Sequence, residues 1–156
     1  MNTEYSQLEL LARQLHQAHR NAVSAELTAR GLGEIGHPML MTILKQVEQA
    51  PEHTVSQRAL ADVLHISPAA VANSLKSMEK GGYIRREPVE EDARRNRVLL
   101  TDKGREAVDG CEAVFVAVER RMFTGFTPEE RSLLAGMRVR MLKNLRENTP
   151  EIKEEG

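Results

Sequence analysis

Residues 56–83 read SQRALADVLHISPAAVANSLKSMEKGGY and contain two short helical patterns with only residues 65–66 between them. Ser56 and Ser67 each precede one of these patterns, and a serine there accepts a hydrogen bond from a free amide of the first helical turn. Pro68 follows in the first turn of the second pattern, where its missing N–H costs nothing. The sequence therefore predicts a helix, a sharp turn and a second helix.

The second of these helices has two different faces. Val71, Leu75 and Met78 recur at helical spacing, so we expect them to be buried. Small residues lead the opposite face, and lysines follow them. This face comprises Ala69, Asn73, Lys76 and Lys80, with Ala70 and Ser77 beside it. A helix fits the major groove of duplex DNA, where asparagine pairs with adenine and an alanine methyl contacts thymine, while lysines suit the phosphates.

Two strand candidates follow the second helix, at residues 83–87 and 96–100. The residues between them, 88–95, have the composition of a turn and carry charges of both signs. The pattern predicts a β-hairpin with a long tip. An arginine at such a tip can enter a narrow minor groove. Asp92 stands two residues before Arg94, where it can hold that side chain by a charged hydrogen bond.

Four more helices are predicted around this centre. Apolar residues at helical spacing mark residues 6–30, a segment from Pro38 to just before Pro51, and residues 102–122. Thr127 with a glutamate three residues later forms a capping box before a last helix. The fold class is therefore mainly α with a small β-hairpin wing. It is a winged helix-turn-helix flanked by N- and C-terminal helices, whose apolar faces need a partner surface.

Composition narrows the class of protein further. The 156 residues carry a net charge of −1 and a single cysteine, which excludes an internal disulfide and a cysteine-rich zinc site and fits the cytoplasm. No apolar run approaches the roughly 18 residues of a membrane span, and the N-terminus lacks a signal-peptide pattern. Residues 54–101 hold eight basic and six acidic residues, so the middle is basic relative to its flanks.

Three stretches in this order resemble the MarR (multiple antibiotic resistance regulator) family. They are residues 56–67, residues 75–86, and Asp92-Ala93-Arg94 followed by residues 98–104. The resemblance covers about residues 38–104 closely. It implies a homodimeric transcription regulator without a cofactor. The family's default is a repressor on a pseudo-palindromic operator, released by a small, often phenolic effector that binds between the dimer helices and the DNA-binding lobe. The residues themselves do not distinguish a repressor from an activator.

The resemblance also implies domains and site residues. The expected domains are an N-terminal dimerisation helix (1–35), a winged helix-turn-helix DNA-binding domain (36–101) and C-terminal dimerisation helices (102–156). Residues of the second helix would face the major groove, Arg94 would enter the minor groove, and Arg95 and Arg97 would lie near the backbone. The full predicted DNA-binding set is Ser56, Gln57, Arg58, Ser67, Pro68, Ala69, Ala70, Asn73, Ser74, Lys76, Arg94, Arg95 and Arg97.

Acidic residues in the wing depart from a purely basic pattern. Glu87, Glu90 and Glu91 accompany its arginines, which predicts a modest and salt-sensitive affinity for DNA.

The sequence gives weaker support for an effector pocket, a metal site or a redox-active cysteine. If an effector pocket exists, we expect it near His16, His37, Met41 and Tyr83, where the first two helices should approach the DNA-binding lobe. His16 and His19 are three residues apart on one helix, but zinc needs about four converging ligands, so no metal site is predicted. Cys111 lies on an apolar helix face, and a buried lone cysteine is usually inert.

Two other classes of function compete with DNA binding. An enzyme is disfavoured, because the sequence holds no glycine-rich phosphate loop, no metal cluster and no nucleophile–base signature. A protein-interaction module that reuses the winged-helix fold would favour bulky apolar or aromatic anchors on the exposed face of the second helix. That face offers alanine, asparagine and lysine instead, which fit a DNA groove better.

Overall fold

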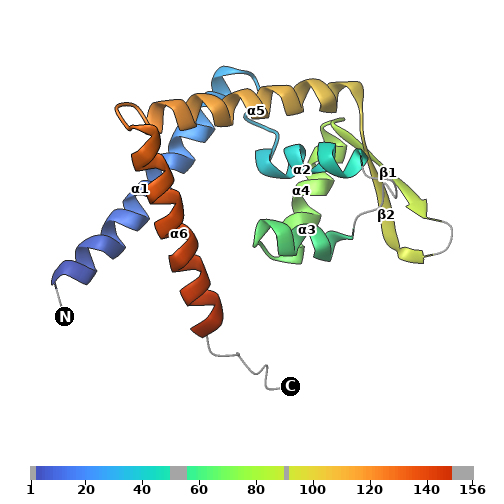
Figure 1. The fold of residues 1–156 in the computed structure, drawn as a ribbon. Coiled ribbons are helices and arrows are strands. Elements are labelled where there is room, and N and C mark those ends of the chain that lie inside the picture. The colour runs from blue at the N-terminus through green and yellow to red at the C-terminus, as the bar shows by residue number, and fades with distance from the viewer. Residues whose placement is uncertain (1–2, 50–55, 90–91, 149–156) are drawn as a thin grey trace. The chain divides into compact units, whose positions relative to one another are not determined.

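Helices and one β-hairpin follow one another along the chain (Figure 1). This computed structural model describes the backbone of residues 3–49, 56–89 and 92–148, and the side chains of residues 6–49, 56–87 and 97–148. The elements in chain order are α1 (Thr3–Ala29), α2 (Pro38–Glu48), α3 (Gln57–Leu64), α4 (Pro68–Lys80), β1 (Ile84–Val89), β2 (Asp92–Leu100), α5 (Asp102–Met122) and α6 (Pro128–Asn148). The predicted fold class is confirmed: the chain is mainly helical, with a small antiparallel hairpin after a helix-turn-helix.

The chain divides into two compact units. One runs to Val118 and the other begins at Glu119, so the division falls inside the continuous helix α5. The domain boundaries expected after residues 35 and 101 both lie within the first unit and stay predictions.

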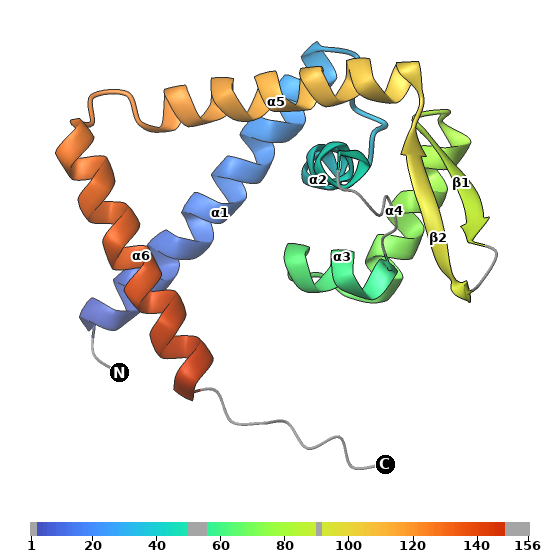
Figure 2. The ribbon, with the colours of Figure 1, turned by 45° about the vertical axis from the view of Figure 1, so that its right-hand side comes forward.

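The first unit is built around one apolar core. It contains the α4 residues Val71, Leu75 and Met78, and no polar or charged side chain is buried among the described residues. In Figure 2, α2, α3, α4 and the hairpin gather beneath one end of α5. The other fully buried large side chains come from the loop before α2, from α2, from α3 and from α5. They are Ile35, Leu40, Met41, Leu44, Leu60, Val108, Cys111 and Val114.

The hairpin has longer strands than the sequence predicts. Its strands pair from Ile84 with Leu100 to Pro88 with Asn96, and then Val89 with Asp92. The prediction of a long turn over residues 88–95 is therefore wrong. Turn-type composition did not prevent pairing, since a proline is accepted in an edge strand and both strands of this sheet are edges. The register shift after Pro88 leaves residues 93–95 as a bulge in β2.

Three predicted helix starts are confirmed. The Oγ of Ser56 accepts a hydrogen bond from the amide of Ala59 at 3.0 Å, and the Oγ of Ser67 accepts one from the amide of Ala70 at 3.1 Å. In the capping box, Thr127 and the side chain of Glu130 each accept the other's backbone amide, at 3.1 and 2.8 Å. These caps fix where α3, α4 and α6 begin.

Ion pairs tie α2 to α5. The Nζ of Lys45 lies 3.2 Å from a carboxylate oxygen of Glu112 and 3.5 Å from one of Asp109, and the hydrogen bond to Glu112 raises the pKa of Lys45. One turn further along α2, Glu48 pairs with Arg105 at 2.7 Å. Each pair is partly exposed and therefore weak, but together they connect α2 to α5.

A histidine caps α2. The backbone of His37 is extended, and its Nδ1 accepts a hydrogen bond from the amide of Leu40 at 3.2 Å. Only an unprotonated Nδ1 can accept this bond. The side chain is half-buried, and its burial lowers the pKa of His37 below the ordinary value of 6.5.

We predict that His37→Asn flattens the dependence of stability on pH just below neutrality. The folded protein binds the histidine proton less readily than the unfolded chain, so the free energy of unfolding falls as the pH drops through about 6.5. Asparagine is a good helix cap that does not titrate, so it keeps the bond and removes this loss. Urea unfolding at pH values of about 7.5 and about 5 measures the difference. Equal pH dependence in the two proteins would contradict the assignment.

Candidate nucleic-acid interface

The turn between α3 and α4 is locked by its backbone. His65 adopts the left-handed conformation with φ 53°, which is uncommon for a residue other than glycine. The amide of Ile66 then donates to the carbonyl of Ala61 at 3.1 Å, and the Ile66 side chain packs against the core. Ser67 follows directly as the cap of α4. The start of α4 is thereby held at a fixed place relative to α3.

The two faces of α4 are as predicted. Val71, Leu75 and Met78 are exposed by 1% or less. The opposite face is open to solvent along the length of the helix. Its exposed residues include Ser67, Pro68, Ala69, Asn73, Lys76, Ser77 and Lys80, with Ala70 and Ser74 half-buried at its margins. The exposed face of α4 therefore begins with small residues, which are followed by the side-chain amide of Asn73 and then by Lys76 and Lys80.

The start of α3 contributes the next group of predicted residues. Ser56 and Gln57 are half-buried, and Arg58 is exposed. Because the Ser56 side chain already caps α3, it is oriented by the helix itself.

The wing carries a row of arginines, several of them paired with acids. Arg97 is exposed on β2 and stands opposite Glu87 in the register. On β1, Arg85 lies 3.1 Å from Glu87. The side chains of Asp92, Arg94 and Arg95 lie outside the described residues. Their backbone belongs to β2, where Asp92 pairs with Val89 and the two arginines lie in the bulge.

One ion pair joins the wing to α4. The Nε of Arg86 lies 2.5 Å from a carboxylate oxygen of Glu79, and the arginine side chain is only 24% exposed. Sequence reasoning missed this pair, because the two residues lie on different elements and share no periodicity. It braces strand β1 against the last turn of α4.

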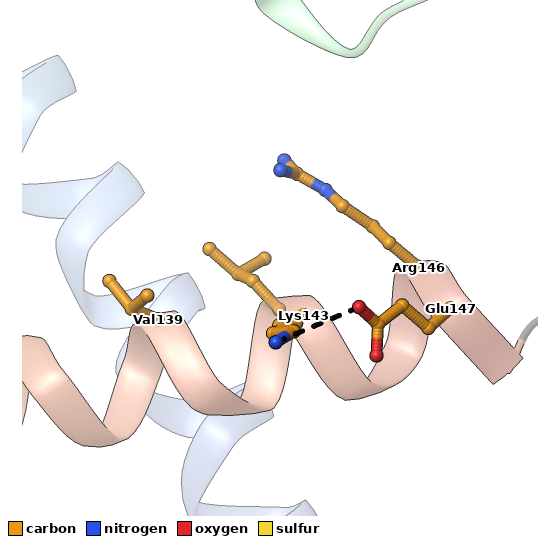
Figure 3. A pocket seen from close by; sticks show the side chains of 5 residues that line it. Val139, Lys143, Arg146 and Glu147 are labelled. Atoms are coloured by element: carbon orange, nitrogen blue, oxygen red, sulfur yellow. Dashed lines mark ion pairs between the residues drawn. The ribbon is translucent and has the colours of Figure 1, made fainter.

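The four residues expected around an effector lie on different elements, and the prediction of a site there stays a prediction. His16 is exposed on α1, His37 caps α2, Met41 is fully buried, and the Tyr83 ring is covered by the Lys103 ammonium 4.4 Å from its centroid. None of them lines either of two shallow depressions on α6. Figure 3 shows the smaller, of about 360 Å³, where Lys143 pairs with Glu147 along the surface of a single helix.

Cys111 has no sign of reactivity. It is fully buried, and burial, together with Glu112, raises the pKa of its thiol to about 11. A protonated, covered thiol is a poor nucleophile. Among the described residues, no three metal-ligating side chains converge. None of the helices in the described ranges is long and apolar enough to cross a membrane.

Comparisons with known proteins agree with this geometry. Residues 38–95 match the family model described as the MarR family. An uncharacterized HTH-type transcriptional regulator of Bacillus subtilis is 32% identical over 106 residues, which are 68% of this chain and 62% of that protein. The chain thus spans less than two thirds of this relative's length.

Two solved structures have the same fold. A MarR family transcriptional regulator from Silicibacter pomeroyi is 25% identical, with a TM-score of 0.63 over 91% of this chain and 90% of that one. A MarR family regulator from Streptomyces coelicolor in complex with DNA is 20% identical, with a TM-score of 0.75 over 97% of this chain and 91% of that one. These relatives are described as transcription regulators, which agrees with the prediction against catalysis for the matched part of the chain.

We predict that Glu79 and Arg86 are energetically coupled. Replacing either one alone leaves its partner without an opposite charge, whereas Glu79→Arg combined with Arg86→Glu restores the pair in reverse. A double-mutant cycle from urea unfolding should give a coupling of about 0.5–1 kcal/mol at low salt, and less at high salt. If the change in the free energy of unfolding of the double variant equals the sum of the changes in the two single variants, the pair does not brace the wing.

Proposed function

Because residues 38–95 of this chain belong to the MarR family, we propose that the protein is a transcription regulator that binds duplex DNA as a homodimer. The single observation that carries the proposal is the exposed face of α4, with small residues leading, then Asn73, then Lys76. The helix is presented by a helix-turn-helix and flanked by a hairpin, the arrangement that places a helix in the major groove. DNA as the partner implies a cytoplasmic protein.

The proposed roles divide the interface into base and phosphate contacts. Asn73 reads a base edge, and Ala69 and Ala70 allow the close approach that this contact needs. Lys76, Ser67 at the amino end of α4, and residues 56–58 at the amino end of α3 hold phosphates. The remaining members of the predicted set, Pro68 and Ser74, border the same face.

The wing supplies the second part of the proposed interface. Arg94 enters the minor groove, where negative potential is concentrated, and Arg95 and Arg97 contact the backbone. The exposure of Arg97 supports this role. A bulge in a strand re-aims the side chains it carries, which suits residues that must leave the plane of the hairpin.

Exposed apolar helix faces support the homodimer. On α1, Leu8, Leu11 and Leu15 are 61%, 60% and 45% exposed. On α6, the exposed apolar side chains include Leu133 and Leu142, which are 65% and 49% exposed. A helix gains most of its stability from packing an apolar face, so these faces need cover. We propose that a second copy of the chain provides it, through the same surface on both subunits.

Repression and release by an effector complete the proposal. A small aromatic or phenolic molecule that favours one arrangement of the dimer would change the spacing of the two α4 helices, and DNA affinity would fall by linkage. The residues proposed for its site remain His16, His37, Met41 and Tyr83. Since Met41 and Tyr83 are covered here, such a site requires a rearrangement of the side chains around them.

We predict that Asn73→Ala and Lys76→Ala affect DNA binding differently. Against a duplex selected from a random pool and a scrambled duplex, Asn73→Ala should weaken only the selected one, by about 5- to 150-fold. Lys76→Ala should weaken both and lower the salt slope by about one per protomer. Fluorescence anisotropy at several salt concentrations measures this, with Lys143→Ala as the matched control. Equal, weak binding of the wild-type protein to every duplex would refute DNA recognition.

We predict that Leu142→Glu dissociates the dimer without unfolding the chain. In a monomer this exposed position tolerates a charge at a cost of about 0.5 kcal/mol or less, whereas in the interface the charge would be buried. Sedimentation equilibrium should show twice the chain mass for wild type and a shift toward one chain for the variant. Val63→Glu, on α3 and 63% exposed against 49% for Leu142, is the control. A monomeric wild type, or a variant that remains fully dimeric, would contradict the interface.

A further inference from the structure

The end of α4 and the start of α5 are joined by hydrogen bonds between residues about twenty positions apart in the sequence. The hydroxyl of Thr101 donates to the carbonyl of Gly82 at 2.6 Å and accepts from the amide of Gly104 at 3.0 Å. The amide of Thr101 also donates to the carbonyl of Tyr83 at 3.1 Å. The residue that caps α5 therefore also binds the chain that leaves α4.

Lys103 adds a second connection at the same place. Its Nζ donates to the carbonyl of Gly81 at 2.6 Å and lies 4.4 Å from the centroid of the Tyr83 ring. Gly81 is the residue that ends α4, so the ammonium sits at the negative end of that helix. A cation over an aromatic face gains further attraction.

The backbones meet too closely for a side chain to stand between them. A Cβ added to Gly104 would lie 2.0 Å from the carbonyl oxygen of Tyr83. Gly82 has a φ of +79°, a conformation that side-chain-bearing residues rarely adopt. The residues Gly81, Gly82, Tyr83, Thr101, Lys103 and Gly104 together form what we call the α4–α5 clasp.

We propose that Lys103 is a positioning residue that, through the clasp, fixes the direction of α4 relative to α5. The inference rests on the proposed function, since it concerns how α4 meets DNA. Thr101 and Gly104 join the backbones, but only Lys103 joins a side chain of α5 to both the last carbonyl of α4 and the ring beyond it. Without the ammonium, the backbone joint remains while the end of α4 gains freedom to tilt.

Freedom to tilt should affect sequence-selective binding most. A bidentate bond to a base edge depends on the direction of the helix, whereas phosphate attraction does not. Lys103 already has its ammonium bound to Gly81 and covering Tyr83, so it is not expected to add a phosphate contact of its own. Selectivity should therefore fall while the salt dependence of binding stays the same.

The test compares Lys103→Met, which keeps the apolar stem, with Lys103→Arg, which keeps the cation. For protein that circular dichroism shows to be folded, the ratio of affinities for a selected and a scrambled duplex should fall about tenfold in Lys103→Met and be rescued in Lys103→Arg. The salt slope should equal that of wild type. Lys103→Leu, which also has no donor and no charge, replaces Lys103→Met if the latter fails to fold.

Three results would overturn the inference. An unchanged affinity ratio in folded Lys103→Met would make the residue merely stabilising. A salt slope lowered by about one would make it a direct phosphate contact. An unchanged rate of amide hydrogen exchange at Gly82 and Tyr83 would show that the clasp does not hold the end of α4.

The exchange measurement needs no DNA, so it separates this inference from the proposed function. The amides of Gly82 and Tyr83 donate to carbonyls of α4 at 3.0 and 2.9 Å, and both should exchange faster in Lys103→Met. The amide of Ile66, in the turn before α4, is the internal control. If wild type selects no duplex but exchange still accelerates, the proposed function fails while the clasp stands.

Discussion

The packing of the first unit and the exposed face of α4 both depend on the burial of one apolar stripe on α4. Val71, Leu75 and Met78 are withdrawn from water, which fixes the rotation of the helix about its own axis. Everything on the opposite face is then exposed as a consequence. The same stripe is part of the core shared by α2, α3, the hairpin and α5, so the face offered to solvent and the packing of the first unit are set together.

Much of this arrangement is readable from local sequence, because it depends on local rules. Serine before a helical pattern, proline in a first turn and apolar residues at helical spacing gave α3 and α4 with their caps and faces. His37 escaped notice as a cap, since histidine is not a usual residue there, although the following Pro38 marks the position. The signals that succeeded are those whose cause lies within one turn of helix.

What the sequence did not reveal depends on partners that lie on other helices and strands. The strands extend toward the tip because pairing is decided by the opposite strand, which outweighs the turn-like composition of residues 88–95. No periodic sequence pattern predicts the Glu79–Arg86 ion pair or the hydrogen bond from Lys103 to Gly81, because each joins residues of different elements. On α6 the sequence shows an apolar stripe, and side chains of that stripe such as Leu133 and Leu142 are exposed.

The single cysteine, Cys111, allows the opening of the folded core to be measured by thiol labelling. Cys111 is fully covered and protonated at neutral pH, so a thiol reagent reaches it only when the core beneath α5 opens. With one cysteine in the sequence, the labelling signal is unambiguous. At saturating reagent the rate of modification equals the rate of opening, and at low reagent it reports the population of the open state. The protein thus carries, without any engineering, a probe of how often its core is breached and of what a bound partner does to that frequency.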